Sequence, residues 1–216
     1  MSAALLDAIT KGELESVRNA LDADPSLAAA RDAQGVSALL FAAYNRQLDI
    51  VELFVSRRTD FDVFEAAALG RLSTLRPLLH DHPDLLDAYS TDGFTPLHLA
   101  CFFAQAPAAD FLVDRGADVH AVAQNPSAVR PLHSAVAARN SAIVEILLRA
   151  DASVNASQAG GWTALQAAAK HGDVALCRML LVHGADPHAA ADDGQTAVDF
   201  ARENGSPELL ALFEGR

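Results

Sequence analysis

The chain has 216 residues, of which 51% are hydrophobic and 6% aromatic, and this Ala- and Leu-rich composition favours helices. A formal net charge of −12 excludes nucleic acid and anionic lipid as partners of the surface as a whole, because both carry dense negative charge. No stretch reaches the roughly 18 apolar residues of a membrane span, and the N-terminal residues lack the pattern of a signal peptide. We therefore expect a cytoplasmic protein that contacts no membrane, in which the thiols of Cys101 and Cys177 stay free.

The first half of the chain contains a long internal repeat. Residues 3–60 align with residues 61–118 at a constant offset of 58 without a gap, so that Pro25 corresponds to Pro83. Each block has the pattern of two helix pairs. The segment that leads into the third pair, residues 57–63, is too short for a full hairpin loop. We interpret the two blocks as a duplication, because self-similarity at a fixed period is the signature of repeat architectures.

A shorter repeat follows, whose units start at Thr95, Arg130, Thr163 and Thr196. The threonine hydroxyl is expected to cap the first helix of a unit, and Pro96 suits the first helical turn. A Gly or polar residue then turns the chain into a second helix with its own apolar stripe. Neither helix can bury its stripe alone, so we expect the units to stack.

The motifs carried by these units resemble the ankyrin repeat. They are Thr95-Pro96-Leu97-His98-Leu99-Ala100, Pro131-Leu132-His133, "HGD" at 171–173, "RGADVHA" at 115–121 and "HGADPHA" at 183–189. The resemblance implies an all-α solenoid of helix-turn-helix pairs with short β-hairpins, in which His98 and His133 tie neighbouring repeats by hydrogen bonds. It also implies one domain over 1–216, a stand-alone array with about seven units: 1–33, 34–60, 61–90, 91–124, 125–158, 159–192 and 193–216. The Ala-rich composition is bacterial in style.

The sequence departs from this pattern at several places. Arg130 replaces the capping Thr, with an expected loss of about 1 kcal/mol. Pro77 falls inside a predicted helix, where we expect a kink or an early 3₁₀ turn at a cost of about 3 kcal/mol. Asp151 stands where Gly ends the corresponding helices, and the hairpin before Arg130 is two residues longer than the others.

The sequence contains none of the common nucleotide-binding or hydrolase motifs, and we expect neither a cofactor nor a catalytic site. The densest group of possible metal ligands is His80, Asp81, His82 and Asp84, whose spacing matches no known site. A metal-dependent or small-molecule enzyme that uses these residues remains an alternative. A purely structural or chaperone-like role is another.

The resemblance implies a monomeric, non-catalytic module that binds a protein partner through its concave face and hairpin tips, in a regulatory or scaffolding role. Aromatic residues at such positions are typical of binding hot spots. The alternative is that the long hairpin at 122–130 folds over Phe102 and Phe103 and buries them. The candidate protein-binding residues, expected to include one apolar stripe, are Tyr44, Tyr89, Phe94, Phe102, Phe103, Val129, Trp162, Lys170 and His171.

Overall fold

The computed structural model describes residues 1–215 and consists of helices joined by short connections. Within these residues there are two isolated β-bridges but no strand. The α-helices are α1 (Ala3–Lys11), α2 (Leu14–Ala23), α3 (Ala38–Tyr44), α4 (Leu48–Arg57), α5 (Val63–Ala68), α6 (Leu72–Asp81), α7 (Pro96–Phe102), α8 (Ala106–Asp114), α9 (Pro131–Ala137), α10 (Ser141–Arg149), α11 (Ala164–Lys170), α12 (Val174–Val182), α13 (Ala197–Glu203) and α14 (Pro207–Glu214). The 3₁₀ helices are η1 (Pro25–Ala29), η2 (Pro83–Asp87) and η3 (Ala159–Gly161).

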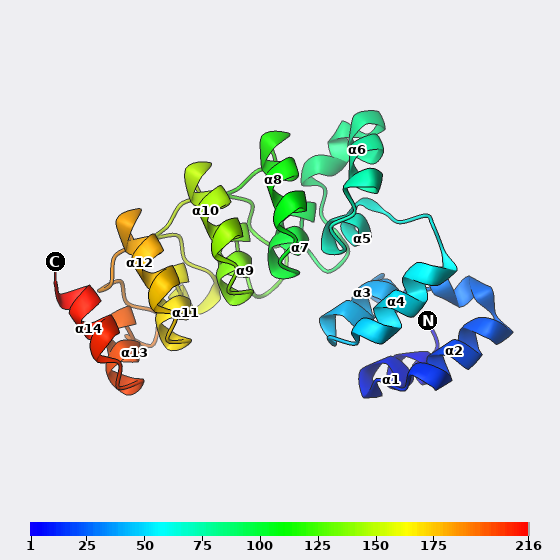
Figure 1. Cartoon of the computed structure of the whole chain (residues 1–216), viewed down its shortest axis with the longest axis horizontal. Coiled ribbons are helices and arrows are strands. Elements are labelled where there is room, and N and C mark those ends of the chain that lie inside the picture. Colours follow the sequence, from blue (N-terminus) through cyan, green and yellow to red (C-terminus); the bar gives the residue numbers. More distant parts are fainter. Residues whose placement is uncertain (216) are drawn as a thin grey trace.

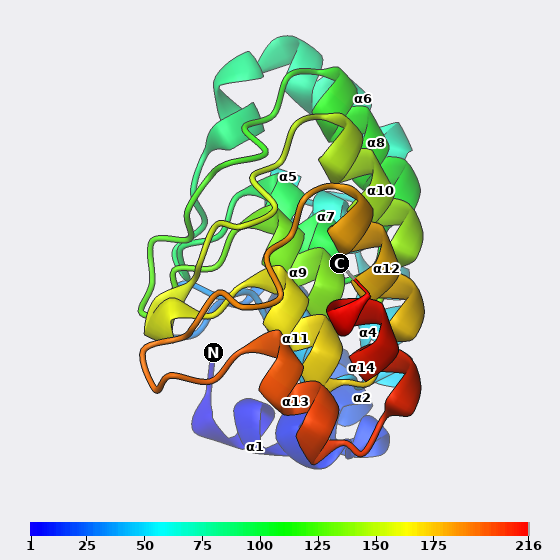
Figure 2. The same cartoon turned by 90° about the vertical axis from the view of Figure 1, so that its left-hand side faces the viewer.

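The helices succeed one another as pairs, and most of them form one row. In Figure 1, the pairs from α5/α6 onward stand side by side toward the C-terminus. Figure 2 shows α6, α8, α10 and α12 as an outer layer, α5, α7, α9 and α11 as an inner layer, and the connecting segments projecting on the opposite side. We call these projecting segments the fingers. This is the stacked, all-α solenoid that the repeat predicted.

The first helix of each pair is short, and its start is fixed by a cap. A seven-residue helix is unstable alone, so its capping bonds and packing matter. The hydroxyl oxygens of Thr95, Thr163 and Thr196 each accept a hydrogen bond from the backbone N–H three residues later, as predicted. Arg130 makes no such side-chain bond; its backbone N–H donates instead to Nδ1 of His133, at 3.1 Å. The other unusual helix residue, Pro77, lies within α6 without interrupting it.

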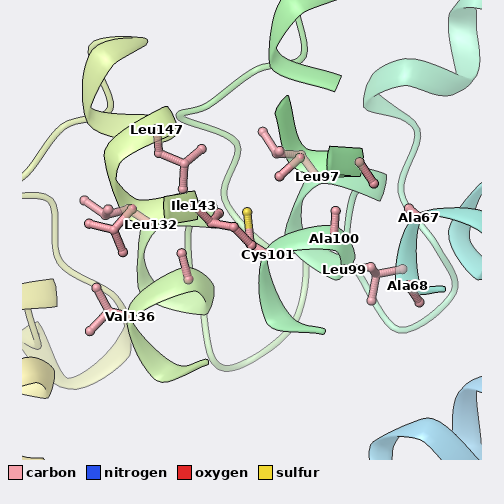
Figure 3. Packing of buried hydrophobic residues seen from close by; sticks show 14 of the residues in the cluster. Ala67, Ala68, Leu97, Leu99, Ala100, Cys101, Leu132, Val136, Ile143 and Leu147 are labelled. Carbon is pink, nitrogen blue, oxygen red and sulfur yellow. The ribbon is translucent and has the colours of Figure 1, made fainter. Parts of the chain in front are cut away.

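The core runs continuously between the pairs. Figure 3 shows Leu132 and Val136 of α9, Ile143 and Leu147 of α10, and Cys101 of α7 as members of one buried cluster. On the α5 side of α7, small side chains such as that of Ala100 occupy the helix contact, which allows the helices to approach closely. Both cysteines are buried and free, as expected from their apolar neighbours.

The fingers are tight turns, each closed by a backbone hydrogen bond. The donor and the acceptor are four residues apart at 32–36, 90–94, 158–162 and 191–195, but six apart at 123–129. The longer connection before Arg130 is therefore confirmed. Neighbouring fingers are also tied together, since the N–H of Gln124 donates to the carbonyl of Gly93 at 2.8 Å. A Cβ on Gly93 would lie 2.6 Å from the Gln124 backbone, which explains the glycine there.

The four N-terminal helices depart from the row. In Figure 1, α1–α4 lie below α5 and α6 and run across the direction of the helices in the row. The α4–α5 connection, residues 58–62, has no finger to stack on its neighbours. A buried ion pair holds this junction instead: the Arg58 guanidinium contacts both carboxylate oxygens of Glu65, at 2.8 and 3.1 Å. The first block of the duplication is thus turned relative to the second, although α2 and α6, and α3 and α7, begin 58 residues apart.

Candidate functional site

A hollow of about 460 Å³ opens on the inner face of the row, between α7 and α9 and beside the fingers. We call it the groove. Its walls come from three sources: the first helices of two successive pairs, three fingers, and α3 of the turned N-terminal block. The lining residues are Tyr44, Phe94, His98, Leu99, Phe102, Ser127, Val129, His133, Ser134, Ala137 and Gln158.

The rings of Tyr44 and Phe102 line one end of the groove, and the ring of Phe103 packs against both. The ring of Phe102 lies 5.1 Å from that of Phe103 and 6.0 Å from that of Tyr44, both edge to face, and Tyr44 and Phe103 are 5.3 Å apart. Such pairs each add about 0.5–1.5 kcal/mol beyond their buried area. Phe102 nevertheless remains 47% exposed. The adjacent phenylalanines therefore have different surroundings: Phe103 is half-buried, and Phe102 faces the groove.

The long finger does not cover Phe102. Ser127 and Val129 of that finger line the groove together with the ring, so the finger forms a wall of the hollow and leaves it open. The residue at the Phe102 position in the next pair is Ala137, at the end of α9. Because Ala137 is much smaller than Phe102 at the equivalent position, the space of the groove is left open between α7 and α9.

Tyr44 is held in place by a polar contact across the turned junction. Its hydroxyl donates to Oδ2 of Asp92, at 2.8 Å, and the Ser90 hydroxyl donates to the same carboxylate. Burial, followed by the Asp92 charge, raises the pKa of Tyr44 well above its ordinary value. The phenol therefore stays a neutral donor, and it anchors α3 to the finger at 90–94.

Two buried histidines form the floor of the groove and link successive pairs. Nε2 of His98 lies 3.1 Å from the Val129 carbonyl oxygen, and Nε2 of His133 lies 3.1 Å from that of Ala156. Each Nδ1 faces the backbone N–H of the residue three positions earlier, which assigns the neutral ring with its proton on Nε2. Burial lowers the pKa of both histidines to about 4. The predicted tie between neighbouring repeats is confirmed for His98, whereas the acceptor of His133 lies at the end of its own predicted unit, in the segment before α11. The groove walls carry no positive charge from these rings at neutral pH.

The remaining predicted residues lie elsewhere on the same side of the molecule. Trp162 packs on Phe200 with ring centroids 5.0 Å apart, and the ammonium of Lys170 lies 4.8 Å from the Trp162 ring. His171 bonds the Ala167 carbonyl through Nδ1, at 2.8 Å. Tyr89 lines a separate hollow with Asp92. The aromatic residues thus form distinct clusters, because each ring packs on its nearest neighbour, whereas the sequence predicted one stripe.

Among residues 1–215, no three His, Cys, Asp or Glu side chains are grouped so that they could hold a metal ion; His80 and His82 are exposed on and after α6. Burial raises the pKa of the Cys101 thiol, and raises that of Cys177 to about 12, so neither is a thiolate at neutral pH. Over the same residues, no helix combines the length and the apolar character needed to cross a membrane.

The predicted site residues did not include Gln158 and Ala137, which line the groove, or Asp92, which accepts the Tyr44 hydroxyl beside it. The offset of 58 places Gly35 and Gly93 in equivalent finger turns, which locates Asp92 in a turn but does not reveal its contact with Tyr44. Ala137 is the counterpart of Phe102, since the two lie at the same distance from Arg130 and Thr95, respectively. Its small side chain leaves the space that forms the groove. A residue that contributes by being small has no chemical group that would single it out in the sequence.

Comparisons with known proteins agree with this architecture. A family model described as ankyrin repeats (3 copies) matches residues 63–158 and 132–213. The putative palmitoyltransferase ZDHHC13 of Danio rerio is 29% identical over 195 residues, which is 84% of this chain and 30% of that protein. The probable E3 ubiquitin-protein ligase XBOS34 of Oryza sativa subsp. japonica is 42% identical over 76 residues, 34% of this chain and 15% of that protein. RelA-associated inhibitor of Mus musculus is 40% identical over 76 residues, 35% of this chain and 9% of that protein. The chain spans less than a third of each of these relatives.

Proposed function

The chain belongs to the ankyrin-repeat family, and we propose that it is a protein-binding module that holds its partner in the groove between α7 and α9 and against the adjacent fingers. The observation that carries this proposal is the exposed ring of Phe102 beside the apolar hollow above Ala137. Large apolar side chains that line a concave surface are typical of binding hot spots. We propose further that the module acts by recognition alone, in a regulatory or scaffolding role.

The names of the relatives support recognition over chemistry. One relative is named as a probable ligase, another as a putative transferase and a third as an inhibitor. In each case the match covers less than a third of the relative's own length. Proteins with such different activities share the repeat segment. Because function resides in sites carried by a fold, a segment shared across these activities is best explained as a recognition part.

Affinity capture tests the proposal. The bait is the wild-type chain, and the host lysate supplies the candidate partners, which are identified by mass spectrometry. The Ala137→Trp variant fills the hollow from an exposed position at the end of α9, so the fold has room for the new ring. The matched control is Val182→Trp, at a 76% exposed position of the outer helix α12.

A partner that is captured by the wild type and by Val182→Trp, but not by Ala137→Trp, supports binding in the groove. Equal capture of every partner by all three baits would overturn it. Far-UV circular dichroism and thermal melting check that each variant keeps its helices. A variant that melts early is replaced by Ala137→Leu, which occupies less of the hollow.

A further inference from the structure

The groove has the size of one or two side chains. Its volume of about 460 Å³ lies in the lower half of the roughly 300–1,000 Å³ range of ligand pockets. Phe102, Leu99 and Ala137 give it carbon-rich walls. A hollow of this kind suits a single bulky apolar side chain that projects from an extended segment. The fingers and the aromatic rings form walls on either side of it, so a side chain can enter while the backbone of the segment stays outside.

An uncompensated negative charge lies just beyond the Tyr44 end of the groove, in the adjoining hollow that Asp92 lines. The Asp92 carboxylate accepts hydrogen bonds from the hydroxyls of Tyr44 and Ser90, which are both neutral. Among residues 1–215, no Lys or Arg forms an ion pair with Asp92. A carboxylate with two neutral donors is fixed in position and still attracts a cation.

The surface that continues from Asp92 is also negative. The five finger turns, residues 32–36, 90–94, 123–129, 158–162 and 191–195, contain four aspartates and no Lys or Arg. The arginine that precedes the first turn, Arg31, is paired with Asp62. Of the other basic residues near these turns, Arg139 contacts Asp173 and Lys170 lies over Trp162. Arg130, directly after the turn at 123–129, donates to the His120 carbonyl and is a cation close to His133. A partner segment that runs along the finger at 90–94 therefore meets negative charge at Asp92, and complementary charge sets specificity and association rate.

Two polar side chains in the groove remain available to a peptide backbone. The amide of Gln158 and the hydroxyl of Ser134 both line the hollow, and neither makes a side-chain hydrogen bond within the described residues. A main chain offers N–H and C=O groups at each residue, which the Gln158 amide can pair as both donor and acceptor.

We infer that the groove binds a short linear peptide segment that places one bulky apolar side chain between Phe102 and Ala137 and a Lys or Arg beside Asp92. This inference rests on the proposed function and specifies the chemistry of the partner. The apolar side chain supplies the buried contact. The Lys or Arg supplies a positive charge, which pairs with the Asp92 carboxylate.

Selection from a displayed library of random dodecapeptides tests this inference. The library is panned in parallel on the wild-type chain, on Ala137→Trp and on Asp92→Asn. The asparagine keeps an oxygen that can accept the Tyr44 hydroxyl while it removes the charge. We expect wild-type selection to enrich peptides with a bulky apolar residue next to Lys or Arg, at least about tenfold over Ala137→Trp. On Asp92→Asn, the apolar anchor should persist and the preference for Lys and Arg should fall.

Three results would overturn the inference: no enrichment on the wild type, equal enrichment on Ala137→Trp, or enriched peptides that are acidic or lack an apolar anchor. These results separate the inference from the proposed function. If capture from lysate depends on Ala137 while the library shows no such consensus, the groove binds a protein in another manner, and only the inference is lost. If Ala137→Trp melts early, Ala137→Leu takes its place in the panning.

Discussion

Acid should destabilise the folded chain through His98 and His133 before most carboxylates titrate. Burial lowers the pKa of both rings from the ordinary 6.5 to about 4. The unfolded chain therefore binds more protons below pH 6.5, and stability that is present in full above that pH is lost as the pH falls toward 4. For each histidine, these values predict a loss of about 2 kcal/mol between pH 7 and pH 5.

The chain supplies its own replacement for this test. Gln166 occupies the same capping position in α11 as His98 does in α7: its Oε1 accepts from the Thr163 N–H at 2.6 Å, and its Nε2 donates to the Gln195 carbonyl at 2.7 Å. His98→Gln and His133→Gln should therefore each remove about 2 kcal/mol of the acid loss and change stability at pH 7 by less than about 1 kcal/mol. The reverse change, Gln166→His, should add an acid loss of similar size.

Urea denaturation followed by far-UV circular dichroism at pH 7 and pH 5 measures these differences. The difference between wild type and each variant isolates the histidine from the carboxylates, which titrate in all of them. If the double glutamine variant lost as much free energy between pH 7 and pH 5 as the wild type, the reasoning about the two buried rings would be refuted.

Three further predictions concern the fold, and urea denaturation tests each of them. Arg58→Ala leaves Glu65 fully buried without its cation and should lower the free energy of unfolding by about 3–5 kcal/mol. Replacing both residues by Met should lower it much less. Equal losses in the two variants would contradict the role of the ion pair. Ala104 has a left-handed backbone with φ of 59°, so Ala104→Gly should stabilise by about 1 kcal/mol, while Ala211→Gly inside α14 should destabilise by about as much. Phe102→Ser should cost about 1 kcal/mol because the ring is 47% exposed, and a loss of about 3–5 kcal/mol would show that it is core.

The local features of the fold could be predicted because their partners are close in sequence. Thr95 and His98 are three residues apart, and a capping box of this kind depends only on one helical turn. The offset of 58 likewise predicted that α7 would repeat α3, since equal sequence in equal local surroundings forms equal helices. The inter-repeat bonds of His98 followed from the resemblance to the family.

The arrangement of the site could not be predicted in the same way. Tyr44 and Asp92 meet across 48 positions, and their contact depends on how the connection at 58–62 turns the first block. Periodicity indicates the face of a helix on which an aromatic ring lies, but it does not indicate the residue against which that ring packs. For this reason Trp162 packs with Phe200 and not with the cluster around Phe102.

Site-specific photo-crosslinking tests the central claim, that the partner is held between α7 and α9, most directly. A photoreactive phenylalanine analogue replaces Ala137 in one preparation and Val182, on the outer helix, in a second. After irradiation in host lysate, mass spectrometry identifies the crosslinked segment of the partner. We predict one recurrent segment attached at position 137 and absent at position 182. Crosslinks at position 182 alone, or the same partners at both positions, would contradict a binding site in the groove.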